Sequence, residues 1–263
     1  MVARRVTTPL FSAGLIDAIT DGETVLGPLR TKPTGIAGRV AMVTDVVSGQ
    51  KRIGRCGWKA QQKTLLAFAG DAYLHEMGIM NRFLPMENAP IGNMALLARF
   101  ARVPDLENKV DPADVKSDMD RLEDFMSRLA PPPRSAVTGN AVAGERLVAS
   151  IDGVSCHTPA MRTSKHEVAA LIEKTAGLYS DLLRHDVGAP GAGIAQGAAG
   201  GREMRTAPFW GLRARSAWLS DGRAVTVDAA IRGHDGEAAA ARDKYGASSA
   251  ADRAAVPAFL NTL

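Results

Sequence analysis

Cysteine is scarce in this chain: Cys56 and Cys156 are the only two among 263 residues. Two cysteines are too few to imply a disulfide framework, and the sequence leaves open whether this pair meets. Long hydrophobic runs are also missing, since no apolar stretch approaches the roughly 18 residues that a membrane-spanning helix needs. Arg4 and Arg5 are not followed by an apolar stretch, so the N-terminus does not read as a secretory signal.

Several common signatures of chemistry are missing as well. The chain has no phosphate-binding glycine loop followed by Lys-Ser/Thr, no G-x-S-x-G elbow and no His-Glu-x-x-His zinc motif. The glycine-rich stretch 188–193 does not follow a predicted strand, so we do not interpret it as a nucleotide loop. The net charge of +4 is small, and Lys and Arg are scattered. This pattern argues against a nucleic-acid partner.

The hydrophobic fraction of 46% is typical of a globular chain with a real core. Residues 40–43 suggest a small strand, and residues 61–72 a short helix. The clearest helix is predicted to begin near Asp111, a plausible N-cap followed by Pro112. Its expected buried stripe has spacings of 3 and 4 and consists of Val115, Met119, Leu122, Met126 and Leu129.

Prolines 131–133 should end that helix and mark a domain boundary. We therefore expect a loop-rich portion over residues 1–110, a linking helix and proline stop over 111–134, and a second domain over 135–263. In that domain, residues 165–176 look like an amphipathic helix and residues 188–201 like a mobile loop. Further helices are expected at 225–231, at 237–245 and at 249–263, the last disturbed at Pro257.

Cys156-His157 is the most informative pair of residues. It looks like the second half of the C-x-x-C-H motif that attaches c-type haem, in which thiols form thioethers and the histidine binds iron. Gly153 occupies the place of the first cysteine, so only Cys156 can form a thioether. The competing interpretation is a small buried thiol beside a solvated loop histidine.

Blocks spread over the whole chain support the haem interpretation, because together they resemble the di-haem oxidoreductase family, also called thiol oxidoreductases. This family is related to bacterial di-haem cytochrome c peroxidases. The resembling blocks are Thr8–Phe11, Gly14–Ile16, Gly54–Ala60, Met77–Ile79, Cys156–Pro159, Tyr179–Leu183 with His185-Asp186, Arg205–Pro208, Trp210–Leu212, Asp221–Ala224 and Gly236–Ala238.

The resemblance implies a mainly α-helical protein with a cytochrome-c-like haem domain, preceded here by a loop-rich segment with short helices and minor strands. Family members carry two haem domains, and this chain corresponds to the C-terminal two-thirds of one, without the first attachment motif. At most one haem c, held by a single thioether, is therefore expected. A periplasmic location also follows from the resemblance, whereas a true start at Met1 would make the chain cytoplasmic.

Five positions depart from the family pattern. Gly153 replaces a cysteine, Val187 replaces a methionine in His-Asp-Met-Gly, and Ser220 replaces a histidine in Leu-His-Asp-Gly-Arg-Ala. Met204 stands where the family has an aromatic residue, and Cys56 where it has phenylalanine. The first three changes remove groups with haem or proton chemistry, which suggests relaxed selection on the haem site.

The resemblance gives roles to individual residues. His157 is the expected iron ligand, Arg205 a partner of a haem propionate, and Met204 or Met77 a possible distal thioether. The alternatives are an Arg205–Glu203 ion pair and methionines that serve as core packing. His185 is expected to be a surface histidine. Trp58 is expected to be core packing, with relay of electrons between redox centres as the less favoured role.

Two functions stay open. The first is a haem-c oxidoreductase portion that moves electrons and reduces peroxide, with an electron donor protein or a small-molecule oxidant as partner. The second is a haem-less family member that acts as a binding or structural module, or as a remnant. The sequence does not indicate the oligomeric state.

Overall fold

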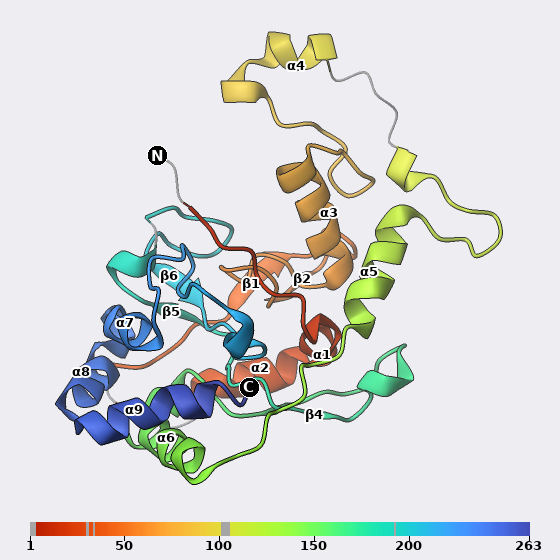
Figure 1. Cartoon of the computed structure of the whole chain (residues 1–263). Coiled ribbons are helices and arrows are strands. Elements are labelled where there is room, and N and C mark those ends of the chain that lie inside the picture. Colours follow the sequence, from red (N-terminus) through yellow and green to blue (C-terminus); the bar gives the residue numbers. More distant parts are fainter. Residues whose placement is uncertain (1–3, 30–31, 34, 101–105, 192) are drawn as a thin grey trace.

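The computed structural model describes residues 4–29, 32–33, 35–100, 106–191 and 193–263. The chain is mainly α-helical, as expected, with its strands confined to short antiparallel pairs (Figure 1). The helices of the described part are α1 (Ala13–Ala18), α2 (Asp21–Leu29), α3 (Leu65–Met77), α4 (Met94–Phe100), α5 (Asp118–Arg128), α6 (Gly139–Ser150), α7 (Val227–Arg232), α8 (Ala239–Ala247) and α9 (Ala250–Leu260). The strand pairs are β1 (Ala41–Thr44) with β2 (Lys51–Gly54), β3 (Met161–Arg162) with β4 (Thr175–Ala176), and β5 (Arg184–Asp186) with β6 (Glu203–Arg205).

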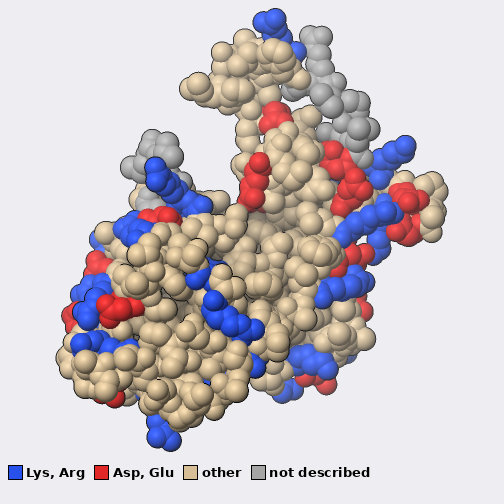
Figure 2. Space-filling view, viewed as in Figure 1, with Lys and Arg blue, Asp and Glu red and all other residues tan. Residues whose placement is uncertain are grey.

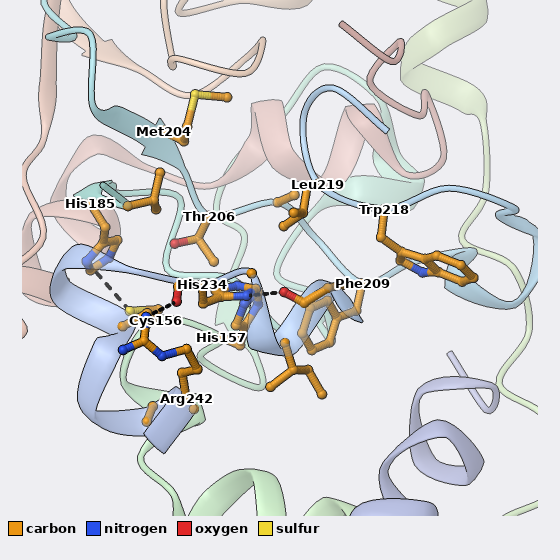
Figure 3. Close-up of a pocket in the computed structure, with 18 of the residues that line it drawn as sticks. Cys156, His157, His185, Met204, Thr206, Phe209, Trp218, Leu219, His234 and Arg242 are labelled. Carbon is orange, nitrogen blue, oxygen red and sulfur yellow. Dashed lines mark hydrogen bonds between the residues drawn. The ribbon is translucent and has the colours of Figure 1, made fainter. Parts of the chain in front are cut away.

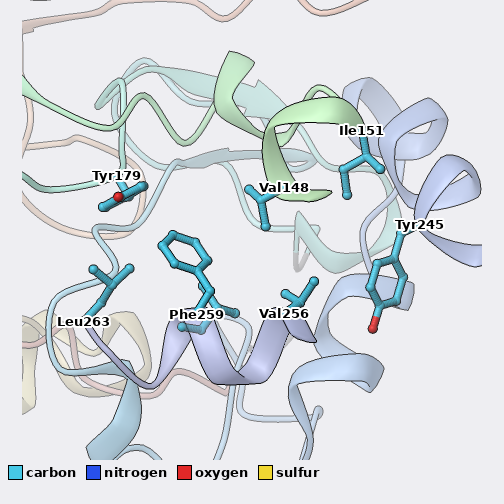
Figure 4. Close-up of a cluster of buried hydrophobic side chains, with 8 residues drawn as sticks. Val148, Ile151, Tyr179, Tyr245, Val256, Phe259 and Leu263 are labelled. Carbon is cyan, nitrogen blue, oxygen red and sulfur yellow. The ribbon is translucent and has the colours of Figure 1, made fainter. Parts of the chain in front are cut away.

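Helices α6 and α9 pack against each other and build the largest buried apolar cluster (Figure 4). Thr138 caps α6 by accepting a hydrogen bond from the Ala141 amide. Close approach of the two helices depends on Gly144, because a β-carbon there would lie 2.2 Å from the Ala255 carbonyl oxygen. The cluster consists of Val148, Ile151, Tyr179, Tyr245, Val256, Phe259, Leu260 and Leu263.

Gly144→Ala is expected to lower the free energy of unfolding by about 1–3 kcal/mol, because overpacking outweighs the better helix propensity of alanine. Gly139→Ala in the same helix is the matched control, since a β-carbon at Gly139 has no neighbour within 4 Å. Urea unfolding of both variants tests this. Equal stability of the two variants would mean that α6 and α9 separate without cost.

The helix predicted from Asp111 begins later than expected. Residues 111–116 form a turn in which Val115 has φ 58°, and Val115 is 76% exposed rather than part of a buried stripe. Ser117 caps α5 through a reciprocal capping box with Asp120. The second half of the predicted stripe is correct, because Met119 and Met126 are buried and the helix ends before the prolines.

The helix predicted over residues 165–176 is wrong. A short 3-10 turn at Ala169–Leu171 leads into β4, and Glu173 takes φ 51°, which no helix interior allows. The apolar residues of this segment therefore do not form one buried helical face. Leu171 is buried, whereas Ile172 is exposed. The predicted strand at 40–43 is confirmed as β1, and the predicted helix 61–72 is observed as α3, which begins after its Thr64 cap.

The glycine-rich stretch 188–201 is held in place by hydrogen bonds from the side chain of Lys59. Residue 192 lies outside the described residues. The ammonium of Lys59 is fully buried and donates to three carbonyls, those of Gly191 at 3.4 Å, Gly200 at 2.8 Å and Glu203 at 2.6 Å. The three predicted C-terminal helices are observed as α7, α8 and α9, and α9 continues through Pro257 because its inner face packs on α6.

Positive and negative side chains are interspersed on the face in Figure 2, in line with the scattered charges of the sequence. Helix α4 lies on an arm that projects beyond α3 and α5 (Figure 1). In the described part of the chain, no helix has the length and apolar character that crossing a membrane requires. The division at residues 111–134 remains a prediction.

Candidate functional site

A mostly apolar cavity of about 250 Å³ opens beside the α6–α9 cluster, and several of its core side chains form one wall. The end of α6, the β5–β6 hairpin, the segment 205–220 and helices α7 to α9 contribute the remaining walls. Four of the residues that the sequence indicated for haem line this cavity, namely Cys156, His157, Met204 and Arg205. Figure 3 labels the first three of them. The fold therefore brings together residues that are up to 49 positions apart in the chain.

His157 is fixed by the turn that follows α6. Asp152 takes φ 68°, a 3-10 turn spans Gly153–Ser155, and the His157 amide donates to the Gly153 carbonyl at 2.9 Å. Its Nδ1 lies 3.0 Å from the Tyr179 carbonyl oxygen. Because a carbonyl only accepts, Nδ1 carries the proton and Nε2 keeps a free lone pair.

The surroundings of His157 keep its imidazole neutral. The Phe209 ring stacks on it with centroids 4.1 Å apart. Burial lowers the pKa of His157 to about 4, and the nearby His234 adds to that effect. A neutral imidazole with one nitrogen anchored and the other available is the form that binds a metal ion. The competing interpretation, a solvated loop histidine, does not describe this half-buried ring stacked on Phe209.

His185 is buried, not on the surface as the sequence suggested. Its Nε2 donates to Asp181 Oδ2 at 3.0 Å, and its Nδ1 to Glu237 Oε2 at 2.7 Å. The Cys156 sulfur lies 3.6 Å from the same Nδ1 (Figure 3). Burial alone lowers the pKa of His185, but the hydrogen bonds to Asp181, Cys156 and Glu237 outweigh it and raise the pKa to about 11.

Outer partners complete this charged group. Lys32 Nζ pairs with Asp181 at 2.9 Å, and Arg39 pairs with Glu237 at 3.0 Å. Burial raises the pKa of Asp181 and of Glu237, but the bonds to His185 outweigh it, so both pKa values lie below their usual range. His185 is therefore an imidazolium held between two carboxylates, next to the thiol.

Met204 and Arg205 are brought to the cavity by β6. Met204 stands opposite His185 in the β5–β6 register. Arg205 is buried, which lowers its pKa to about 10, and it donates to the carbonyls of Gly57 at 2.7 Å and Thr206 at 3.2 Å. The predicted alternative, an Arg205–Glu203 ion pair, is wrong, because Glu203 pairs with Arg39 and Arg184 instead.

The three departures from the family pattern that affect haem chemistry, Gly153, Val187 and Ser220, all line this cavity. A β-carbon on Gly153 would lie 2.9 Å from the Val148 carbonyl oxygen, so a cysteine there would require a local shift. Trp58 also lines the cavity, with its indole N–H bonded to the Val6 carbonyl at 2.6 Å. Met77, in contrast, is 61% exposed and is not among the lining residues.

The sequence did not indicate several lining residues with polar or aromatic side chains, among them His234, Arg215 and Trp218. His234 Nδ1 lies 2.8 Å from the Ala230 carbonyl oxygen, and burial lowers its pKa. It therefore resembles His157 in being neutral with one anchored nitrogen. No local motif distinguishes these residues, since only the folded helices and loops bring them to the cavity.

The residues that line the cavity have the chemical properties that suit an iron porphyrin. Its lining is mostly apolar, His157 offers a free nitrogen, and Cys156 lies at the edge. Among the described residues, no group of three or more His, Cys, Asp or Glu could hold a metal ion by itself. A porphyrin brings its own four nitrogens and needs only axial ligands from the protein.

The sequence comparison agrees with these features. Residues 1–263 match the family described as "di-haem oxidoreductase, putative peroxidase". The chain therefore belongs to this family, whose name supports a haem oxidoreductase kind of function. No curated protein matches the chain.

Proposed function

We propose that this chain binds one haem c in the cavity, where His157 would ligate the iron and Cys156 would form a single thioether, and that it transfers electrons or reduces peroxide. One observation carries the proposal: the predicted attachment residues and the predicted flanking residues line a single cavity. When bound, the haem would supply the redox chemistry, and the protein would set its position and surroundings.

Each wall residue would have a separate task. The Tyr179 carbonyl orients His157 and raises the electron density at its free nitrogen. Phe209 holds the imidazole plane from one side. His185 lies close enough to the Cys156 sulfur to orient it. Electrons would come from a donor protein, and a small-molecule oxidant would accept them. Periplasmic location is part of the same proposal, because haem c is attached there.

The second candidate is a family member that keeps the scaffold without haem. The crowding at Gly153 favours it, since the backbone there leaves little room for the first cysteine of the motif. Val187 and Ser220 add to this, because neither can supply the sulfur or imidazole that the family pattern has at those positions.

A pyridine haemochrome spectrum separates the two candidates. The chain is expressed with an added signal peptide together with the machinery that attaches haem c, and the denatured protein is measured after acid-acetone extraction. We expect a haem band that survives extraction. A folded protein without such a band would establish the haem-less alternative. A circular dichroism spectrum of the purified protein, recorded before denaturation and extraction, checks that the chain is folded.

A further inference from the structure

Three arginines line the cavity, and they differ in their partners. Arg205 donates to two backbone carbonyls, and Arg242 pairs with Asp235 at 3.2 Å and Asp243 at 2.9 Å. The half-buried side chain of Arg215 has neither a hydrogen bond nor an ion pair with any described residue. Burial lowers the pKa of Arg215, and no carboxylate opposes that effect.

The same segment carries a second donor that lacks an acceptor in the described part of the chain. The indole nitrogen of Trp218 is buried and has no hydrogen-bond partner among the described residues. Buried donors are rarely left unpaired, and each unmet one costs about 1–3 kcal/mol. Arg215 and Trp218 are three residues apart and both line the cavity. A buried indole N–H without an acceptor and a half-buried guanidinium without a counter-charge, both among the described residues, indicate a ligand with an anionic acceptor at this end.

The position of this segment agrees with a ligand that has two different edges. In Figure 3, Trp218 lies at one end of the drawn residues, and His185 with Cys156 lies at the other, with His157 between them. A porphyrin carries its reactive vinyl groups on one edge and its two carboxylates on the opposite edge. The Cys156 sulfur at one end and the indole of Trp218 at the other match that pattern.

We propose that Arg215 and the indole N–H of Trp218 bind the carboxylate edge of a planar macrocycle in this cavity. The inference rests on the proposed function and adds the residues that orient the ligand. A guanidinium paired with a carboxylate in a partly buried site forms a charge-assisted, two-pronged hydrogen bond. Arg215 and Trp218 thus act as positioning residues. Arg205, in contrast, serves the fold through its hydrogen bonds to backbone carbonyls.

The test uses iron-free protoporphyrin IX, whose fluorescence reports binding without any iron ligation or covalent attachment. The full chain is titrated with the free diacid and, separately, with its dimethyl ester, which has the same ring but no carboxylate. We expect Arg215→Gln to weaken binding of the diacid by about tenfold to a hundredfold and to leave binding of the ester unchanged. Trp218→Phe, which removes the indole N–H and keeps an aromatic ring, should act in the same direction with a smaller effect.

Arg213→Gln is the matched control. Arg213 lies two residues away, is exposed, and donates to the Pro133 carbonyl and the Ser135 hydroxyl outside the cavity. It should leave both titrations unchanged. If Arg215→Gln weakens both porphyrins equally, or neither, the inference is overturned while the proposed function stands. If the wild-type chain binds neither porphyrin, both are overturned. Thermal melts of each variant confirm that it is folded.

Discussion

Cys156→Ala is expected to carry no covalently bound haem, whereas Cys56→Ala should retain the full wild-type amount. Cys156 lines the cavity, 3.6 Å from His185, and is the one cysteine there. Cys56 is buried in a separate cluster around Leu65 and Met119. Burial raises the pKa of Cys56 to about 12, so its thiol stays protonated and unreactive.

The measurement is haem staining of a denaturing gel together with the intact mass of each variant. Loss of the haem mass in Cys156→Ala alone would assign the thioether to this sulfur. Staining that is unchanged in Cys156→Ala would contradict the assignment and point to tight non-covalent binding. A loss in both variants would show that the cysteines act through folding, which the melting temperature of each variant checks.

The sequence predicted residues that line one cavity, but it predicted the surrounding helices less well. The Cys156-His157 pair is a local signal, because adjacent residues on one turn must end up near each other. Helical spacing was less dependable. Residues 165–176 have apolar positions at the correct intervals, but Glu173 takes a positive φ and the segment pairs with β3 instead. Tertiary pairing overrode a weak local preference.

The long-range part of the site could not be predicted. His185 was expected at the surface but is buried, and the neighbouring Asp186 pairs with Arg202 instead. The partner of His185, Glu237, lies 52 residues further along the chain, and β5 and the 3-10 turn Gly236–Ala238 before α8 bring the two together. Arg215 was missed for a related reason: an arginine without a partner is visible only after every neighbour is placed.

The buried imidazolium of His185 is expected to contribute strongly to the free energy of unfolding. His185→Gln should lower the free energy of unfolding at pH 6 by about 3–5 kcal/mol, because it leaves two buried carboxylates without their shared cation. The pKa of His185 is raised to about 11, well above the value of about 6.5 expected when unfolded. Its stabilising contribution is therefore complete below about pH 6.5 and is lost progressively as the pH rises toward 11.

At acidic pH the two carboxylates make stability change with pH in the opposite direction. The pKa values of Asp181 and Glu237 lie below their usual range, so their contribution is present above the unfolded values near pH 4 and is lost as the pH falls. Wild-type stability from this group should thus be greatest near pH 5–6 and decline on both sides. The gap between wild type and His185→Gln should narrow steadily from pH 6.5 to pH 9.

Urea unfolding at a series of pH values measures that gap directly. His75→Gln is the matched control, because His75 is 53% exposed and, among the described residues, pairs with Asp71 alone, one turn earlier. This control should stay within about 0.5 kcal/mol of wild type at every pH. A gap for His185→Gln that stays constant from pH 6.5 to pH 9 would mean that His185 is neutral in the folded chain. In that case the carboxylates, and not the imidazole, would carry the proton, and Cys156 would face an uncharged ring.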